Sequence, residues 1–149
     1  MESYSEEDEP QNTSNNVSSK KLQDQVKQIK SKLSNFSRTI DEDQLVSKDA
    51  IFLGITGAGK STLVNHLAGK QLEAIEDEDD EIVIIAPDAV EGMEIGQDMS
   101  SCTKIPTRWV SDENIAYWDC PGFGDTEGPV QDITNAYYIH KLFDKSGKA

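Results

Sequence analysis

The sequence lacks long hydrophobic runs, has few cysteines and carries far fewer basic than acidic residues. Its 149 residues include 14 Lys and Arg against 28 Asp and Glu, for a formal net charge of −14 at pH 7. Because nucleic acids and anionic membranes repel acidic proteins, we expect no nucleic-acid partner, and the charge of the chain as a whole disfavours membrane contact. No apolar run of about 18 residues and no hydrophobic signal region occurs, which predicts a cytoplasmic protein. The two cysteines, Cys102 and Cys120, cannot form a zinc site without other ligands, and the cytosol disfavours a disulfide.

The N-terminal part divides into a polar tail and a helical segment. Residues 1–19 are rich in Ser, Asn and Glu and are expected to form a disordered acidic tail. Residues 20–40 are basic and are predicted to form an amphipathic helix or short coiled coil. This helix could pack on its own domain, self-associate, or lie on a membrane surface. Its apolar residues recur at alternating spacings of four and three: Leu22, Val26, Ile29, Leu33, Phe36 and Ile40.

The strongest motif is GITGAGKS at residues 54–61, a match to the phosphate-binding pattern GxxxxGK[ST], the P-loop. The apolar run 50–53 before it is typical of a buried strand, and the stretch 61–68 after it is typical of a helix. Glycines let consecutive backbone N–H groups surround a phosphate, and the helix N-terminus adds partial positive charge. Lys60 can reach the β- and γ-phosphates, and the Ser61 hydroxyl can ligate Mg²⁺. The motif therefore predicts a nucleoside triphosphate bound with magnesium.

A second motif, Asp119-Cys120-Pro121-Gly122, follows the strand-like run 115–119. An acid at the end of a strand beside the P-loop strand can hold Mg²⁺, directly or through water. Gly122 offers an N–H that can meet a γ-phosphate and be released after hydrolysis. With both motifs, residues 48 to about 145 resemble the translation-factor-like class of P-loop GTPases. The run DCPGFGD at 119–125 is most similar to the septin-like and immune-associated nucleotide-binding branches.

This resemblance implies GTP and Mg²⁺ as ligands. It also implies slow GTP hydrolysis, with the nucleotide-dependent conformational change carried by the switch loops 100–107 and 122–130. It implies a switch I threonine, for which Thr103 is favoured over Thr107 because Thr107 starts the next predicted strand. Lys60 and Thr103 are then expected to act in catalysis, and Ser61, Thr103 and Asp119 to bind the metal. The residues expected to contact the nucleotide are Gly54, Gly57, Ala58, Gly59, Lys60, Ser61, Thr62 and Gly122.

One position departs from the Ras-type pattern. Phe123 stands where those GTPases have a glutamine that positions the attacking water. Because phenylalanine cannot orient a water molecule, we expect intrinsic hydrolysis to be slow. The resemblance suggests that the site is completed by a homodimer across the nucleotide or by an activating protein.

The expected fold is α/β, a P-loop NTPase three-layer sandwich with a mostly parallel sheet. Residues 107–110 and 115–118 are predicted to form an antiparallel hairpin at the sheet edge, 82–86 a short strand, and 130–144 a helix. No NKxD-type base-recognition motif follows Gly122, so residues 48–149 are expected to be the N-terminal part of a G domain, truncated after the switch II helix. We then expect an open edge on the P-loop strand, marginal stability and weak, base-indifferent binding.

Two other functions fit the same motifs. GAGKSTL also occurs in ATPases, although only a short segment separates Lys60 from Asp119 here. A scaffold or fragment that does not hydrolyse nucleotide is the other alternative. The six-acid run at 76–81 lacks the alternating ligands and central glycine of a calcium loop, and we interpret it as a solvated loop.

Overall fold

Three short strands form the sheet at the centre of the protein, in the order β1-β5-β4. The structure is a computed structural model that describes residues 12–42, 46–96, 103–123 and 128–146. The elements along the chain are α1 (Asn12–Glu42), β1 (Lys48–Phe52), α2 (Lys60–Leu67), β2 (Glu73–Glu76), β3 (Ile82–Ile85), β4 (Thr107–Val110), β5 (Ile115–Asp119) and α3 (Pro129–Ser146).

The described central sheet contains the expected edge hairpin, but it is mixed and not mostly parallel as expected, because it has one parallel and one antiparallel pairing. β1 runs parallel to β5, with Phe52 opposite Asp119, so the ends of both strands meet at one edge. β4 pairs antiparallel with β5 through a tight turn at 111–114. Asn114 adopts the left-handed φ of 61° that this turn requires, a conformation that Asn tolerates better than most residues. The protein is therefore an α/β fold with a mixed sheet.

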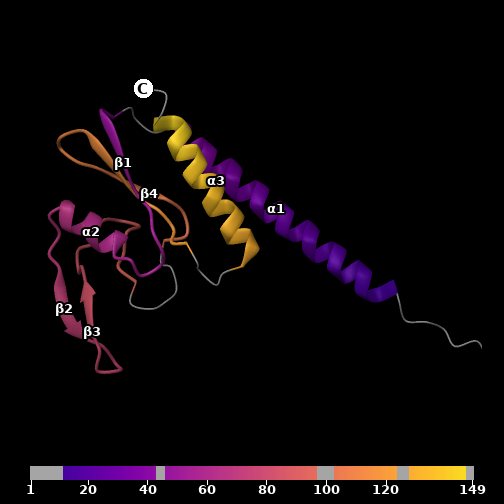
Figure 1. Cartoon of the computed structure of the whole chain (residues 1–149), viewed down its shortest axis with the longest axis horizontal. Helices are drawn as coiled ribbons and strands as arrows, with labels where there is room; N and C mark the ends of the chain where they lie inside the picture. The colour runs from indigo at the N-terminus through magenta and orange to yellow at the C-terminus, as the bar shows by residue number, and fades with distance from the viewer. Residues whose placement is uncertain (1–11, 43–45, 97–102, 124–127, 147–149) are drawn as a thin grey trace, which may run out of the picture.

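Side chains of β5 alternate between the two faces of the sheet. Ala116, Trp118 and Cys120 are buried against α1 and α3. On the opposite face, the Tyr117 ring lies 6.2 Å from the ring of Phe52 and 5.2 Å from that of Trp109. Figure 1 shows α2 on one side of the sheet and α1 with α3 on the other, which gives three layers.

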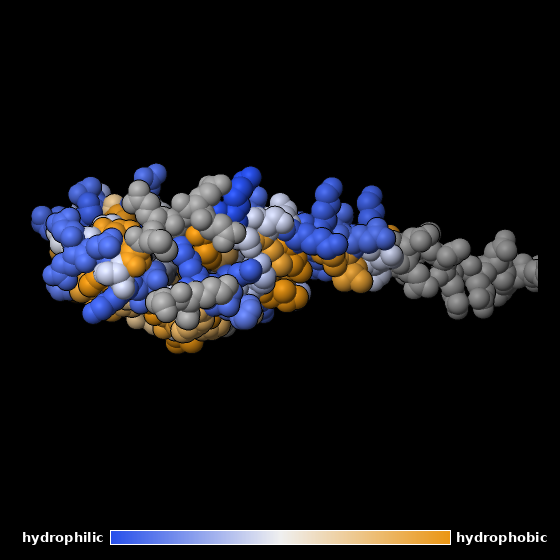
Figure 2. Space-filling view, turned by 90° about the horizontal axis from the view of Figure 1, so that it is seen from above, coloured by the Kyte–Doolittle hydropathy of each residue, from blue (hydrophilic) through white to orange (hydrophobic). Residues whose placement is uncertain are grey.

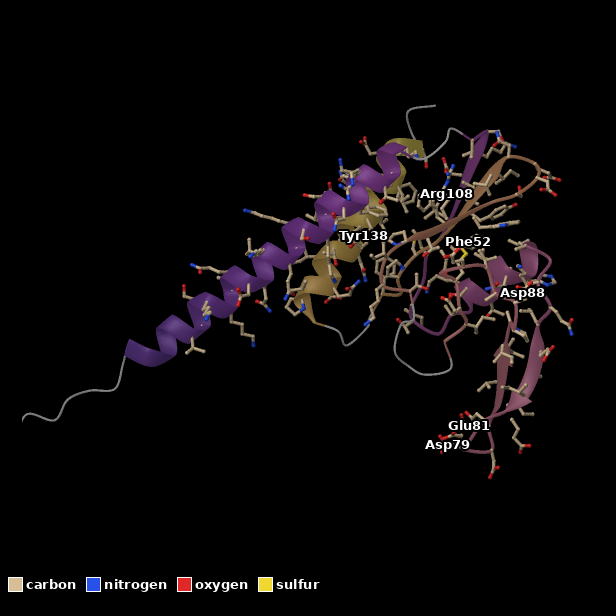
Figure 3. All side chains as sticks on the ribbon, turned by 180° about the vertical axis from the view of Figure 1, so that it is seen from behind. Phe52, Asp79, Glu81, Asp88, Arg108 and Tyr138 are labelled. Carbon is tan, nitrogen blue, oxygen red and sulfur yellow. The ribbon has the colours of Figure 1, made fainter. Side chains whose placement is uncertain are left out.

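The C-terminal half of α1 packs against α3. Phe36 and Ile40 are buried in one cluster with Tyr138 and Leu142 of α3 and with Trp118 of β5. The Phe36 and Tyr138 rings are 4.4 Å apart, and Tyr138 lies between the two helices in Figure 3. Of the three arrangements considered for residues 20–40, packing on the same domain is the one that the structure contains.

The N-terminal half of α1 projects beyond α3. Here the apolar seam is exposed, with 62% of Leu22 and 42% of Val26 accessible to solvent. Figure 2 shows apolar side chains along one side of this projecting helix and charged ones along another. No helix among the described residues is long and apolar enough to cross a membrane.

The start of α1 differs from the predicted boundary at residue 20. The helix begins at Asn12, within the segment expected to be a disordered tail, and residues 1–11 of that tail lie outside the described part of the chain. Extending an existing helix by one residue costs little free energy. Ser and Asn are less favourable than Ala in a helix by only about 0.7 kcal/mol or less. A helix nucleated by the apolar seam can therefore extend back to residue types that favour helix N-termini.

The acidic run lies in the turn of a separate two-stranded hairpin, β2-β3. The predicted strand 82–86 is present as β3, but it pairs with β2, which the sequence did not predict, and not with the central sheet. The Asp77 carboxylate accepts the backbone N–H groups of Asp79 and Glu81, both at 2.9 Å. Asp79 and Glu81 lie at the tip of this hairpin, away from the rest of the molecule (Figure 3). The acids therefore form a solvated turn.

Candidate functional site

The loop of the GxxxxGK[ST] motif connects the end of β1 to the start of α2. It follows Phe52, which Figure 3 labels at the edge where β1 and β5 end. Gly57 and Gly59 have φ values of 78° and 81°, in the left-handed region where a Cβ is unfavourable. A Cβ at either position would have no neighbouring atom within 4 Å, so both glycines face open space. Backbone conformation, and not packing, therefore explains these two glycines.

Lys60 begins α2 and folds back over the loop. Its Nζ donates to the carbonyl oxygens of Ile55 at 2.9 Å and Gly54 at 3.3 Å. The first helical bond, from Leu63 N to Gly59 O at 2.9 Å, starts the helix at the end of the loop. The first backbone N–H groups of α2 have no acceptor within the helix, and they add to the positive end of its dipole. The loop thus gathers an ammonium group and several N–H donors beside open space.

Ser61, Thr103 and Asp119 meet next to this loop, although they come from α2, the segment before β4 and the end of β5. Ser61 Oγ donates to Asp119 Oδ2 at 2.5 Å, and Thr103 Oγ1 donates to the same oxygen at 3.2 Å. Asp119 is 0% exposed, and its other carboxylate oxygen, Oδ1, has no hydrogen-bond partner among the described residues. Burial raises the pKa of the Asp119 carboxyl, while the bonds from Ser61 and Thr103 and the charge of Lys60 oppose that rise.

This oxygen cluster fits a small, hard cation. Mg²⁺ prefers oxygen ligands and usually combines one or two protein groups with phosphate and water. The unpartnered buried Oδ1 of Asp119 is a carboxylate oxygen that such an ion would satisfy. The described residues contain no group of three or more His, Cys, Asp or Glu that could hold a metal alone. A metal here would therefore need additional ligands, such as phosphate oxygens.

The structure distinguishes the two threonines considered for switch I. Thr103 is buried and bonds to Asp119, as described above. Thr107 is the first residue of β4, and its hydroxyl donates to the Ile105 carbonyl at 3.3 Å. Thr103 is thus the one that lies with Ser61 and Asp119. The neighbouring loop residues 100–102 lie outside the described part of the chain.

The chain after β5 lies directly against the P-loop. Phe123 N donates to Gly54 O at 3.1 Å, and Thr56 N donates to Phe123 O at 3.3 Å. A Cβ on residue 122 would lie 2.3 Å from Thr56 Oγ1 and 2.5 Å from Thr56 N, so this contact requires glycine. Gly122 therefore lies against the P-loop backbone. The predicted switch loop continues into residues 124–127, which lie outside the described residues.

The remaining predicted contacts also belong to this loop and helix. Ala58 N donates to Ile55 O at 3.2 Å within the P-loop. Thr62 is part-buried in the first turn of α2.

Cys120, directly after β5, is a buried free thiol. Burial, together with the neighbouring Asp119 charge, raises its pKa to about 12.

Three buried amide side chains near the site were not identified from the sequence. Asn65 donates to Ser61 O and Met93 O, both at 2.8 Å, and fixes the segment after β3 to α2. Gln131 and Asn135 lie in α3 and are almost fully buried. Their polar side chains in helical segments gave no signal in the sequence that could identify a site.

Comparison with known proteins identifies no relative of the chain. No model of a known protein family matches it, no curated protein matches significantly, and no solved structure does so.

Proposed function

We propose that this protein binds the triphosphate of a guanine nucleotide together with Mg²⁺ and acts as a slow GTPase switch. The observation that supports this proposal most directly is the meeting of Ser61, Thr103 and Asp119 beside the P-loop. These residues are far apart in the sequence, and a metal-phosphate site is the chemistry that requires all three in one place. An accidental glycine-rich turn would need no such neighbours.

The phosphates would bind in the P-loop. Left-handed glycines at 57 and 59 leave room for phosphate oxygens to approach the backbone, and the N-terminus of α2 favours negative charge. Lys60 already lies over the loop, where it bonds two neutral carbonyl oxygens. Exchanging these for charged β- and γ-phosphate oxygens would give stronger, charge-assisted bonds.

Magnesium would be held by the hydroxyls of Ser61 and Thr103, with Asp119 binding it directly or through water. A bound ion would supply positive charge to offset the negative charge of the phosphates during phosphoryl transfer. The chain's own contribution is to fix the hydroxyls through the buried Asp119 carboxylate and to bring the Gly122 N–H toward the γ-phosphate. Thr103 and Gly122 are then the two groups whose positions report the presence of a third phosphate.

Hydrolysis would be slow because Phe123 offers no polar side chain to orient water. A second copy of the protein or an activating partner would supply the missing group. The choice of guanine rests on the resemblance of the DCPGFGD run to septin-like and immune-associated GTPases. An ATP-binding protein with the same phosphate chemistry is the rival.

The test is nucleotide binding by Lys60→Ala with Lys70→Ala as a matched control. Lys70 lies beyond the end of α2, and within the described part of the chain its ammonium group makes a surface ion pair with Asp88 at 2.9 Å. Losing charge-assisted bonds to phosphate should weaken binding of a fluorescent GTP analogue roughly 10- to 100-fold in Lys60→Ala. The control should bind like the unaltered protein. Equal affinities in both variants would contradict the phosphate site, and equal displacement by ATP and GTP would favour the ATP-binding rival.

A further inference from the structure

Gln131, in the first turns of α3, connects three separate parts of the protein. It is 5% exposed, and its side-chain amide is bonded on both sides. Its Nε2 donates to the Lys104 carbonyl at 3.0 Å and to Asn135 Oδ1 at 2.7 Å. Its Oε1 accepts a bond from Lys32 Nζ of α1 at 2.9 Å. One side chain therefore contacts α1, the segment beside Thr103, and a second amide in α3.

Asn135 carries this connection to the second nucleotide loop. It lies one helical turn after Gln131 and is also buried. Its Oδ1 accepts from Gln131, so its Nδ2 is directed to the Gly122 carbonyl, at 3.5 Å. Gly122 and Thr103 are the two groups proposed to contact the γ-phosphate and the metal. The pair of amides thus contacts the backbone next to both.

The orientation of the Gln131 amide follows from its partners. An ammonium group can only donate, so Lys32 requires Oε1 on its side. A backbone carbonyl can only accept, so Lys104 requires Nε2 on the other side. Without Lys32, Gln131 loses one of the two groups that fix this orientation, and only the Lys104 carbonyl then disfavours the flipped form, which would place an acceptor against it. The hydrogen bonds therefore form a chain with one donor direction. Lys32 donates to Gln131, Gln131 donates to the Lys104 carbonyl and to Asn135, and Asn135 donates to the Gly122 carbonyl.

We propose that Gln131 is a positioning residue that couples the docking of α1 to the nucleotide site. By holding the Lys104 carbonyl, it keeps Thr103 beside Asp119. Through Asn135 it holds the peptide of Gly122. Lys32 stabilises the orientation in which it does both. This inference rests on the proposed function for its role in nucleotide binding, but the contacts themselves exist without nucleotide.

The coupling acts in both directions. If docking of α1 strengthens nucleotide binding, then nucleotide binding strengthens the docking of α1 by the same free energy. α1 has other attachments that do not depend on Lys32. Ser37 Oγ and Tyr137 OH are 2.9 Å apart, Lys145 Nζ donates to Ile40 O at 2.9 Å, and Phe36 is buried. We call the hydrogen bonds that lead from Lys32 through Gln131 and Asn135 to the two loops the relay. Removing the Lys32 ammonium should therefore disturb the relay while α1 stays packed on α3.

The test compares Lys32→Met with Lys30→Met, which removes an exposed lysine from the same helix. Lys32→Arg should behave like the unaltered protein because it keeps a donor. Gln131→Glu is a second variant, which keeps the acceptor for Lys32 but loses both donors. Binding of a fluorescent GTP analogue is measured with Mg²⁺ and with a chelator. We expect the Mg²⁺-dependent gain in affinity to fall about 5- to 10-fold in Lys32→Met and Gln131→Glu, within the usual range for coupled sites. Affinity without Mg²⁺ should fall less, since the P-loop is untouched and only the Gly122 contact to the γ-phosphate is weakened.

A second readout needs no nucleotide. In the free protein, amide hydrogen exchange at residues 103–107 should be faster in Lys32→Met than in Lys30→Met, while exchange in β2 and β3 is unchanged. If the unaltered protein binds no nucleotide, the proposed function fails, and the exchange experiment alone decides the relay. If nucleotide binds but Lys32→Met matches Lys30→Met in both measurements, the coupling is wrong and the proposed function is unaffected.

Discussion

Phe36 and Leu22 occupy the same apolar seam of α1, yet the structure assigns them opposite surroundings. Phe36 is 3% exposed and packs against Tyr138, whereas Leu22 is 62% exposed on the projecting half of the helix. Phe36→Ala should lower the free energy of unfolding by about 3–5 kcal/mol, because it removes a buried ring and leaves a cavity. Leu22→Ala should change it by about 0.5 kcal/mol or less, since little area is lost and alanine is a good helix former.

Urea unfolding, followed by tryptophan fluorescence, measures both variants. Trp118 lies beneath α1 and α3 and is buried, so its emission reports on this interface. For a chain of this size, the difference in unfolding free energy between the two variants should correspond to a difference of roughly 10 °C in melting temperature. The reasoning would be refuted if both substitutions had equal effects. A larger effect for Leu22→Ala, growing with protein concentration, would instead indicate the self-associating coiled coil.

Three further predictions concern the site. Gly122→Ala should lower the free energy of unfolding by about 1–3 kcal/mol, because the new methyl group would overlap the P-loop backbone; an unchanged melting curve would contradict that contact. Thr103→Ala should reduce the Mg²⁺-dependent part of nucleotide binding, while Thr107→Ala should not. Equal losses of Mg²⁺-dependent affinity in both variants, measured by magnesium titration, would reject Thr103 as the metal-binding threonine. In a Cys102→Ser variant, which removes the other thiol, Cys120 should resist a thiol reagent at pH 8 until the protein unfolds. The thiolate is the reactive form, and burial raises the pKa of Cys120 to about 12. Rapid labelling of the folded protein would be inconsistent with that burial.

The sequence predicted those parts of the fold that depend on local pattern. The apolar run before the P-loop and the run ending at Asp119 specified two strands, and the turn at 111–114 specified the edge hairpin. The position of Asp119 beside the P-loop could be anticipated because the ends of adjacent parallel strands meet at one edge. Ser61 was expected there from the P-loop motif, and Thr103 only from the resemblance to P-loop GTPases. Thr103 was favoured over Thr107 partly from the start of the next strand, and β4 does begin at Thr107.

Other features depend on tertiary contacts that no local pattern reveals. β2 was missed because its sequence, Glu73–Glu76, is half acidic and forms a strand only by pairing with β3. The extent of α1 was underestimated because propagation from a stable segment carries weak helix formers with it. Gln131 and Asn135 acquire their roles from bonds to Lys32, Lys104 and Gly122 in distant segments.

Calorimetric titration measures whether the P-loop recognises phosphates with the help of magnesium. GTP, GDP and GMP are titrated into the protein, each with Mg²⁺ and with a chelator. We expect GTP to bind more tightly than GDP, GMP not to bind measurably, and Mg²⁺ to strengthen GTP binding. Equal affinity for GTP and GMP, or GTP binding that is indifferent to Mg²⁺, would contradict this expectation.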